Sequence, residues 1–216
     1  MLTRLFLCRH GEPDETVRGQ ICGALDVGLS PRGVEQANLL AVALAPEPLV
    51  AVYSSPQRRA LDTARPIAAE HDGAVLEHAG LREIDFGAFE GLSHDEAAAR
   101  YPDLYRSWLE QPARVRFPGG ECCADVRARA VGALGEILGR HEGRSLAVVA
   151  HGGVIRALLA DCLRMSPEAM FRLDQRYGGV NVVDWLDGIP VVRLLNADQA
   201  MLAVGRGSSP RLYSSA

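Results

Sequence analysis

The chain contains short runs of consecutive apolar residues whose length and boundaries are typical of buried strands. Three of them cover residues 4–8, 49–53 and 145–150. Runs of this kind, without polar alternation, predict strands that are covered on both faces of a sheet. Val180–Trp185 and Val191–Leu195 are separated by Asp187-Gly188. This spacing predicts two closing strands joined by a turn.

Helical patterns lie between these strands, and serine residues mark where several of them begin. Ser30-Pro31 and Ser55-Pro56 each combine a side chain that can cap free amide groups with a proline suited to the first helical position. Ser93 and Glu96 have the spacing of a capping box, which predicts a short helix that stops before Tyr101-Pro102. The predicted helices cover residues 31–45, 56–70, 94–100, 121–141 and 153–163.

This alternation of strands and helices predicts the α/β class. We expect a three-layer α/β/α sandwich with a mostly parallel central sheet. Ligands of such sheets bind beyond the carboxyl ends of the strands. His10, Ser54–Arg58 and His151 each follow a predicted strand directly. The three segments are therefore expected to meet at one edge of the sheet.

A chain of 216 residues can form a single domain, which we assign to residues 1–204. The stretch 84–120, rich in proline, arginine and aromatic residues, interrupts the alternation and is interpreted as an inserted lid. Residues 205–216 begin with Gly-Arg-Gly-Ser-Ser-Pro, and we expect them to form a disordered tail.

The composition excludes several kinds of chemistry. All 23 basic residues are arginine, which excludes a Walker-type phosphate loop, a lysine Schiff base and a catalytic lysine. The formal net charge of -4 argues against a nucleic-acid partner. No apolar stretch approaches the roughly 20 residues that span a bilayer, and the first residues lack the pattern of a signal peptide. Five cysteines without a C-x-x-C pair indicate free thiols in a reducing cytoplasm.

Two histidines at the ends of strands suit a pocket that binds and attacks an anion, of which a phosphoryl group is the obvious example. His10 lies between Arg9 and Gly11, and His151 precedes Gly152. A neutral imidazole at His10 can attack phosphorus and form a phosphohistidine. Arg9 can bind the same phosphate with its planar guanidinium fork. Further contacts to the phosphate oxygens are expected from Arg58, from a protonated His151 and from the amide of Gly152.

Six segments resemble, in the same order, the motifs of the histidine phosphatase superfamily, which has the phosphoglycerate-mutase-like fold. They extend over about residues 4–195. The resemblance implies that His10 is phosphorylated, that Arg9, Arg58 and His151 form the phosphate pocket, and that Glu83 donates a proton. The segments are Leu7–Glu12, Leu29–Ala37, Tyr53–Ala64, Leu81–Gly87 with Glu90-Gly91, Pro118–Glu121 and Val149–Gly153.

Glu83 also suits this role chemically. A carboxyl group beneath a lid can protonate a leaving oxygen and can then activate water against the phosphohistidine. Asp85 and Glu90 are alternative acids nearby. Where many members of the family carry Asn shortly after Arg-His-Gly, this chain has Thr16. Its hydroxyl is expected to replace the amide contact to phosphate.

The resemblance implies a metal-independent phosphomonoesterase without a cofactor. Its expected partner is a small phosphomonoester of the sugar phosphate or α-ribazole phosphate type. A cofactor-dependent phosphoglycerate mutase and a non-catalytic phosphate-binding module are the alternatives. The mutase is less favoured, because the stretch after Glu83 lacks the Trp-Arg-Arg-rich pattern of that class. The lid residues Arg114 and Arg116 are candidates to contact a carboxylate or a second phosphate.

No metal site is expected. The remaining histidines show no paired ligand spacing and are interpreted as solvent-exposed. We expect a cytoplasmic protein that binds neither membrane nor nucleic acid, and a homodimer is left open. The four histidines are His71, His78, His94 and His141.

Overall fold

A six-stranded sheet forms the centre of the molecule. The computed structural model describes residues 2–198 and 201–202, so the predicted tail lies outside the described residues. The strands are arranged in the order β3-β2-β4-β1-β5-β6. β1 to β4 are mutually parallel, whereas β5 is antiparallel to both β1 and β6. The mostly parallel sheet is thus confirmed. The strands are β1 (Leu2–Arg9), β2 (Leu49–Ser54), β3 (Val75–Glu77), β4 (Ser145–Ala150), β5 (Val180–Leu186) and β6 (Ile189–Ala197).

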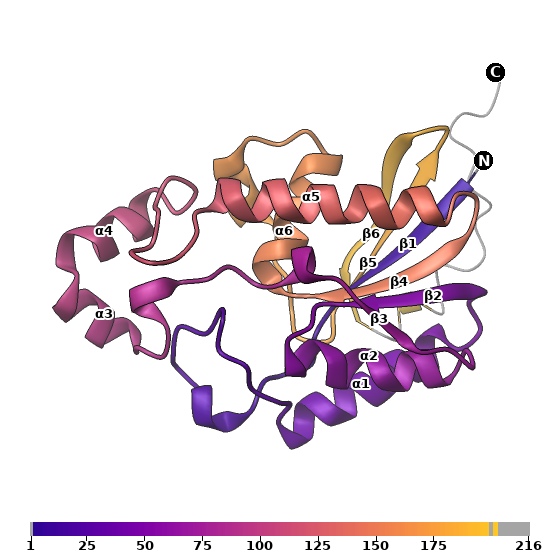
Figure 1. The fold of residues 1–216 in the computed structure, drawn as a ribbon, viewed down its shortest axis with the longest axis horizontal. Coiled ribbons are helices and arrows are strands. Elements are labelled where there is room, and N and C mark those ends of the chain that lie inside the picture. Colours follow the sequence, from indigo (N-terminus) through magenta and orange to yellow (C-terminus); the bar gives the residue numbers. More distant parts are fainter. Residues whose placement is uncertain (1, 199–200, 203–216) are drawn as a thin grey trace.

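The sheet separates two apolar cores, because successive side chains of a strand point to opposite faces. Leu5 and Leu7 of β1 lie in one core with side chains of α5 (Cys123–Arg140) and α6 (Gly152–Cys162). Phe6 and Cys8 lie in the other with side chains of α1 (Pro31–Leu44) and α2 (Arg58–Ala69). Figure 1 shows the two helix pairs on opposite sides of the sheet. The predicted three-layer sandwich is confirmed.

Local capping explains where α1 and α3 begin. Ser30 accepts a hydrogen bond from the amide of Gly33 at 3.0 Å, with Pro31 in the first turn of α1. Ser93 and Glu96 form the predicted capping box of α3 (His94–Arg100). Both interactions lie within four residues of sequence, which is why the sequence reveals them.

The start of α2 differs from the prediction by two residues. The chain continues from β2 through Ser55, whose amide donates to the Val149 carbonyl at 3.0 Å, and the helix begins at Arg58. Ser55 does not cap it. The Arg58 amide instead donates to the Asp26 carboxylate at 2.6 Å. Because the capping group comes from a distant loop, the local pattern could not indicate this boundary.

The interpreted lid contains two short helices and an aromatic cluster. α3 ends before Tyr101, and α4 (Pro102–Glu110), which was not predicted, begins at the proline. The rings of Phe86, Phe89 and Trp108 pack around Phe117 at centroid distances of 4.9 to 5.4 Å. Figure 1 shows α3 and α4 beyond one end of the sheet. The interpretation of residues 84–120 as a lid stays a prediction.

The turn after His10 packs directly against the backbone at the start of α1. A Cβ atom on Gly11 would lie 2.4 Å from the Gly33 carbonyl oxygen, and one on Gly33 would lie 2.1 Å from the Glu12 carbonyl oxygen. Both distances are shorter than any real contact of a Cβ atom. Glycine is therefore required at both positions to bring β1 and α1 together.

We expect Gly33→Ala to lower the free energy of unfolding by about 2 kcal/mol or more, because the added methyl group overpacks a contact between backbones. Gly132→Ala is the matched control, since Gly132 is exposed in α5 and has open space around it. The control should raise the free energy of unfolding by about 0.5–1 kcal/mol, the difference in helix propensity. Urea unfolding of both variants measures this. Equal effects would contradict the close approach.

Candidate active site

His10 is buried at the carboxyl end of β1. Its amide donates to the Ala150 carbonyl at 3.0 Å, which continues the pairing of β1 with β4, and its side chain is 4% exposed. Nδ1 lies 2.6 Å from the Gly11 carbonyl oxygen. Because a carbonyl only accepts, Nδ1 carries the proton. This leaves Nε2 with a free lone pair.

His151 follows β4 and faces His10. It is fully buried, and the two ring centroids lie 4.9 Å apart at an interplanar angle of 59°. Neither ring nitrogen of His151 has a hydrogen-bond partner among the described residues. Buried polar atoms normally have a partner. The two nitrogens are therefore available to a bound group.

Arg9 lies beside both histidines, and its guanidinium group is held by Tyr177 and Gln175. Its guanidinium carbon is 4.0 Å from the centre of the Tyr177 ring, and Nη1 donates to the Gln175 carbonyl at 2.5 Å. Nε is buried without a partner among the described residues. A Cβ atom on Gly152 would be 3.4 Å from the guanidinium carbon. The guanidinium group of Arg9 thus lies next to the first residue of α6.

Arg59, and not Arg58, lies near the two histidines. Arg58 points to solvent, with its side chain 69% exposed and 3.6 Å from Asp62. Arg59 is 1% exposed and donates to the carbonyl groups of Gly23 and Leu25 at 2.7 and 2.6 Å. Its charge contributes to lowering the pKa of both His10 and His151.

The expected placement of Arg58 in the pocket is thus not seen, because successive side chains of a helix point about 100° apart. The sequence did contain a signal for the correct residue. The inward face of α2 follows the helical spacing of Arg59, Thr63 and Ile67.

Thr16 is exposed and is not in contact with the histidines. Its hydroxyl and amide donate to Oδ1 of Asp14 at 2.7 and 2.9 Å, which caps the short helix Glu15–Val17. The Thr16 hydroxyl therefore stabilises a local turn. The expected contact to phosphate has no support in this geometry.

Glu83 caps the start of α6. Its Oε2 atom accepts a hydrogen bond from the Gly153 amide at 2.9 Å, and Oε1 accepts one from the Ile84 amide at 3.0 Å. His151 precedes α6 and provides no side-chain cap. Because Gly153 is two residues from His151, the Glu83 carboxylate lies at the edge of the pocket.

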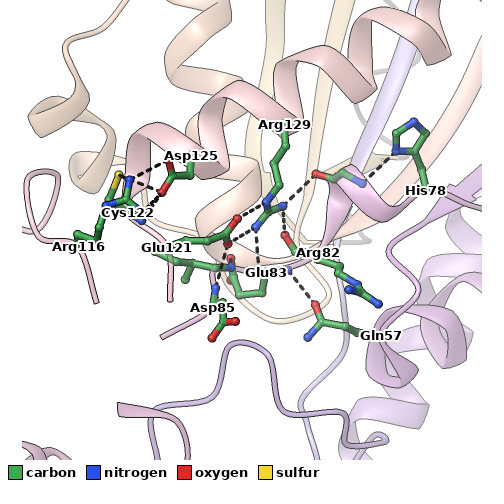
Figure 2. Close-up of polar contacts among 12 residues, drawn as sticks. Gln57, His78, Arg82, Glu83, Asp85, Arg116, Glu121, Cys122, Asp125 and Arg129 are labelled. Carbon is green, nitrogen blue, oxygen red and sulfur yellow. Dashed lines mark hydrogen bonds and ion pairs between the residues drawn. The ribbon is translucent and has the colours of Figure 1, made fainter. Parts of the chain in front are cut away.

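Arg129 fixes the backbone of Glu83, and the sequence analysis did not identify it. Figure 2 shows this α5 residue beside Glu121 and the loop that carries Glu83. Arg129 donates to the Glu83 carbonyl at 3.0 Å and to both oxygens of Glu121 at 2.8 Å. On the other side, the Glu83 amide donates to Oε1 of Gln57 at 2.8 Å. The position of the Glu83 carboxylate thus depends on two polar side chains from separate helices or turns.

The alternative acids support turns. Glu90 accepts hydrogen bonds from the amides of Gly23, Ala24 and Phe86 at 3.0, 2.7 and 2.9 Å. It thereby holds the loop whose carbonyl groups bind Arg59. Asp85 accepts a bond from the Gly87 amide at 2.8 Å.

Burial changes the protonation of the two histidines. The pKa of His10 is lowered well below 6.5, first by burial and then by the charges of Arg9 and Arg59. The pKa of His151 is lowered for the same reasons, burial being the largest. Desolvation and neighbouring cations both disfavour imidazolium. Without a bound anion, the surroundings of His151 therefore favour the neutral imidazole and not the protonated form that the sequence analysis expected.

Two cavities adjoin Glu83. The larger, of about 470 Å³, is polar and extends past Asp26, Arg82 and Asp85. The smaller, of about 210 Å³, is lined by Arg9, Glu83 and Gly152 as well as by aromatic side chains of residues 84–120. Since three of the predicted site residues line the smaller cavity, it is the one that adjoins the histidine pocket.

Arg114, Arg116 and the other histidines have different surroundings. Arg114 is 3.5 Å from Glu168, and Arg116 is 2.7 Å from Asp125, both with exposed guanidinium groups. His94 is exposed as expected, but the other three histidines are partly buried. One of them, His141, lies 3.0 Å from the Tyr53 hydroxyl. Within residues 2–198 and 201–202, no group of three or more His, Cys, Asp or Glu could hold a metal ion.

No helix in the described part of the chain is long and apolar enough to cross a membrane.

Comparison with known proteins identifies relatives that match 73% or more of the chain. The chain is 39% identical over 157 residues to phosphoserine phosphatase 1 of Hydrogenobacter thermophilus, covering 73% of this chain and 74% of that protein. It is 36% identical over 160 residues to a metal-independent phosphoserine phosphatase of Arabidopsis thaliana, covering 73% and 67%. It also spans 54% of the length of a bifunctional protein of Mycobacterium tuberculosis, at 36% identity.

Solved structures show the same fold. The α-ribazole phosphatase of Shigella flexneri superposes with a TM-score of 0.83 at 26% identity, covering 90% of this chain and 96% of that one. A mycobacterial glucosyl-3-phosphoglycerate phosphatase gives a TM-score of 0.83 at 29% identity, covering 92% and 100%. Residues 5–198 match the sequence profile of the histidine phosphatase superfamily, branch 1. The chain therefore belongs to the histidine phosphatase superfamily.

Proposed function

We propose that the chain hydrolyses small phosphomonoesters through a phosphohistidine on His10, with Glu83 as the proton donor. The observation that carries this proposal is the tautomer of His10 together with the groups around its ring. Its Nδ1–H is held by the Gly11 carbonyl, so Nε2 is free, and Arg9 and His151 adjoin it. A nucleophile held in one tautomer beside cations suits phosphoryl transfer.

In the first step, Nε2 of His10 forms a bond to phosphorus while the bond from phosphorus to the ester oxygen breaks. The lowered pKa of His10 keeps its ring neutral and therefore nucleophilic at neutral pH. The departing alkoxide takes the proton of the Glu83 carboxyl group. In the second step, the Glu83 carboxylate removes a proton from water, the resulting oxygen attacks phosphorus, and the P–N bond breaks. Inorganic phosphate leaves and both residues return to their initial states.

The oxygens of the transferred group require positive charge and hydrogen-bond donors. We assign these roles to Arg9, Arg59, the Gly152 amide and His151, and Arg59 takes the place first expected of Arg58. A bound phosphate dianion favours imidazolium at His151, because an opposite charge raises the pKa of a histidine. His151 would then donate to the phosphate oxygens that face it.

The mutase and the non-catalytic module have less support. A mutase must return the phosphoryl group to a second hydroxyl, and the stretch after Glu83 lacks the Trp-Arg-Arg-rich pattern of that class. A binding module would not require Glu83 to be fixed by Arg129 and Gln57. Hydrolysis accounts for both observations.

The proposal also covers the class of substrate, the cellular compartment and the partners of the chain. The names of the relatives favour a small phosphorylated metabolite, and sugar phosphates and α-ribazole phosphate remain candidates. The five cysteines are free thiols, which suits a reducing cytoplasm. The net charge of -4 supports the absence of a nucleic-acid partner. The homodimer stays a prediction.

The neighbouring arginines of α2 provide a matched test of the pocket. We expect Arg59→Met to lower kcat/KM by about 10²–10³-fold, the usual loss when one donor to a developing charge is removed. Arg58→Met should change it less than about threefold, since that side chain is exposed. Phosphate release from p-nitrophenyl phosphate measures both, and Arg59→Lys and thermal melts check that the fold is kept. A larger loss for Arg58→Met would refute the assignment.

Single-turnover experiments quenched at alkaline pH test the mechanism itself. Phosphate should be found on the peptide that contains Arg9 and His10, and label on serine or aspartate would refute the proposal. In Glu83→Gln, formation of the phosphohistidine should slow by about 10²–10⁴-fold with a sugar phosphate. The loss should be clearly smaller with p-nitrophenyl phosphate, because nitrophenolate departs without a proton. Equal losses at this step would assign the acid elsewhere, with Asp85 next in line.

Protonation of the buried histidines should also make stability depend on pH. Because the folded pKa values of His10 and His151 lie below the unfolded value of 6.5, the unfolded chain binds more protons on acidification. Stability is therefore complete above pH 6.5 and declines below it, by up to about 1.4 kcal/mol per pH unit for each histidine. Urea unfolding between pH 7.5 and 5 measures the slope. His10→Gln should reduce it, and an unchanged slope would contradict the burial of a neutral His10.

A further inference from the structure

Arg156 places another guanidinium group beside the proposed phosphate pocket. It lies one turn into α6, and its Nε donates to the Leu173 carbonyl at 2.7 Å. A Cβ atom on Gly152 would be 3.4 Å from Nη1 of Arg156 and 3.4 Å from the guanidinium carbon of Arg9. The two guanidinium groups therefore both lie next to Gly152 and close to each other. Neither the sequence motifs nor the mechanism above uses Arg156.

Two cations held this close favour an anion between or beside them. Arg156 is among the groups that lower the pKa of Arg9, after the larger effect of burial. Nε of Arg9 is buried without a partner among the described residues. Glu83 is the sole acid among the described residues that line the adjoining cavity, and its carboxylate is held by the Gly153 amide. The positive charge at this point is thus in excess.

The adjoining cavity is lined both by these arginines and by apolar side chains. Arg9, Gly152 and Arg156 line one part of the 210 Å³ space, and Phe86, Trp108 and Phe117 line another. A substrate whose phosphoryl group lies against Arg9 has its leaving group in this space. The leaving group is then within the reach of Arg156 and is sheltered by aromatic rings. An ion pair is stronger in such surroundings than in water.

We propose that Arg156 binds a carboxylate of the leaving group, so that the chain prefers phosphomonoesters of hydroxy acids to those of neutral alcohols. This inference rests on the proposed phosphatase function. With Nε bound to Leu173, the remaining fork of Arg156 matches one planar carboxylate. A second phosphate fits less well, because the space is small and Arg114 and Arg116 are engaged elsewhere. An ammonium group would find no carboxylate other than that of the proton donor Glu83 among the described residues that line this space.

The test compares two substrates that differ at one carbon, 3-phosphoglycerate and glycerol 3-phosphate. The wild-type chain should show the higher kcat/KM with 3-phosphoglycerate. Arg156→Gln keeps a donor for the Leu173 carbonyl but removes the charge. It should lower the ratio of the two kcat/KM values by about 10–100-fold, as expected for one charge-assisted hydrogen-bonding group. Arg156→Lys should restore part of the ratio. Arg114→Met, the matched lid variant, should leave the ratio unchanged.

Four outcomes would overturn the inference. Equal losses on both substrates in Arg156→Gln would mean that Arg156 acts on the transferred phosphate or only supports Arg9. A change of the ratio in Arg114→Met instead would move the carboxylate to the lid. A wild-type chain that hydrolyses p-nitrophenyl phosphate but does not favour 3-phosphoglycerate would refute the carboxylate preference and leave the phosphatase proposal standing. Loss of hydrolysis of all three esters in the wild type would instead refute the phosphatase proposal and this inference with it.

Discussion

The geometry of the proposed reaction site depends on the first turn of α6. His151 comes directly before it, the guanidinium of Arg9 lies next to Gly152, and the Gly153 amide holds the carboxylate of Glu83. The amide groups at the start of a helix have no partners within the helix and carry partial positive charge. A phosphoryl group and a carboxylate are the groups that such a terminus favours. One helix start therefore fixes the relative positions of the proposed acid, a histidine and the phosphate.

Positive charge gathered in a buried pocket is costly without partners, and the structure offsets this cost with neutral oxygen atoms. Arg9 donates to the Gln175 carbonyl, and Arg59 donates to two carbonyls of the loop 23–25. That loop is in turn held by Glu90 through backbone amides. Carbonyl groups hold each guanidinium in place without cancelling its charge. The charge stays available to an anionic substrate.

The proposed phosphate pocket and the proposed space for the leaving group are formed by different parts of the chain. The nucleophile and the phosphate contacts lie at the carboxyl ends of β1, β2 and β4, which the sheet fixes rigidly. The space for the leaving group is bounded by aromatic side chains of residues 84–120. Function resides in sites placed on a shared fold. Relatives with the same sheet and different substrates are consistent with a fixed phosphate pocket beside a variable wall.

The sequence by itself determined five of the six strands, the order of layers and the positions of both histidines, but it did not reveal the short edge strand β3. These features depend on apolar runs and on turns within a few residues, so a local pattern is sufficient. The motifs also identified Glu83, and the capping residues Ser30 and Ser93 located the starts of α1 and α3.

Tertiary structure decided the rest. Asp26, a residue of a distant loop, caps the start of α2, and the packing of this helix buries Arg59 and leaves Arg58 exposed. The protonation of His151 depends on burial and on cations from three segments, which no local pattern contains. In the sequence, nothing distinguishes Arg129 and Arg156 from the other arginines of the predicted helices. They gain their roles only because α5 and α6 pack where the Glu83 backbone and Gly152 lie.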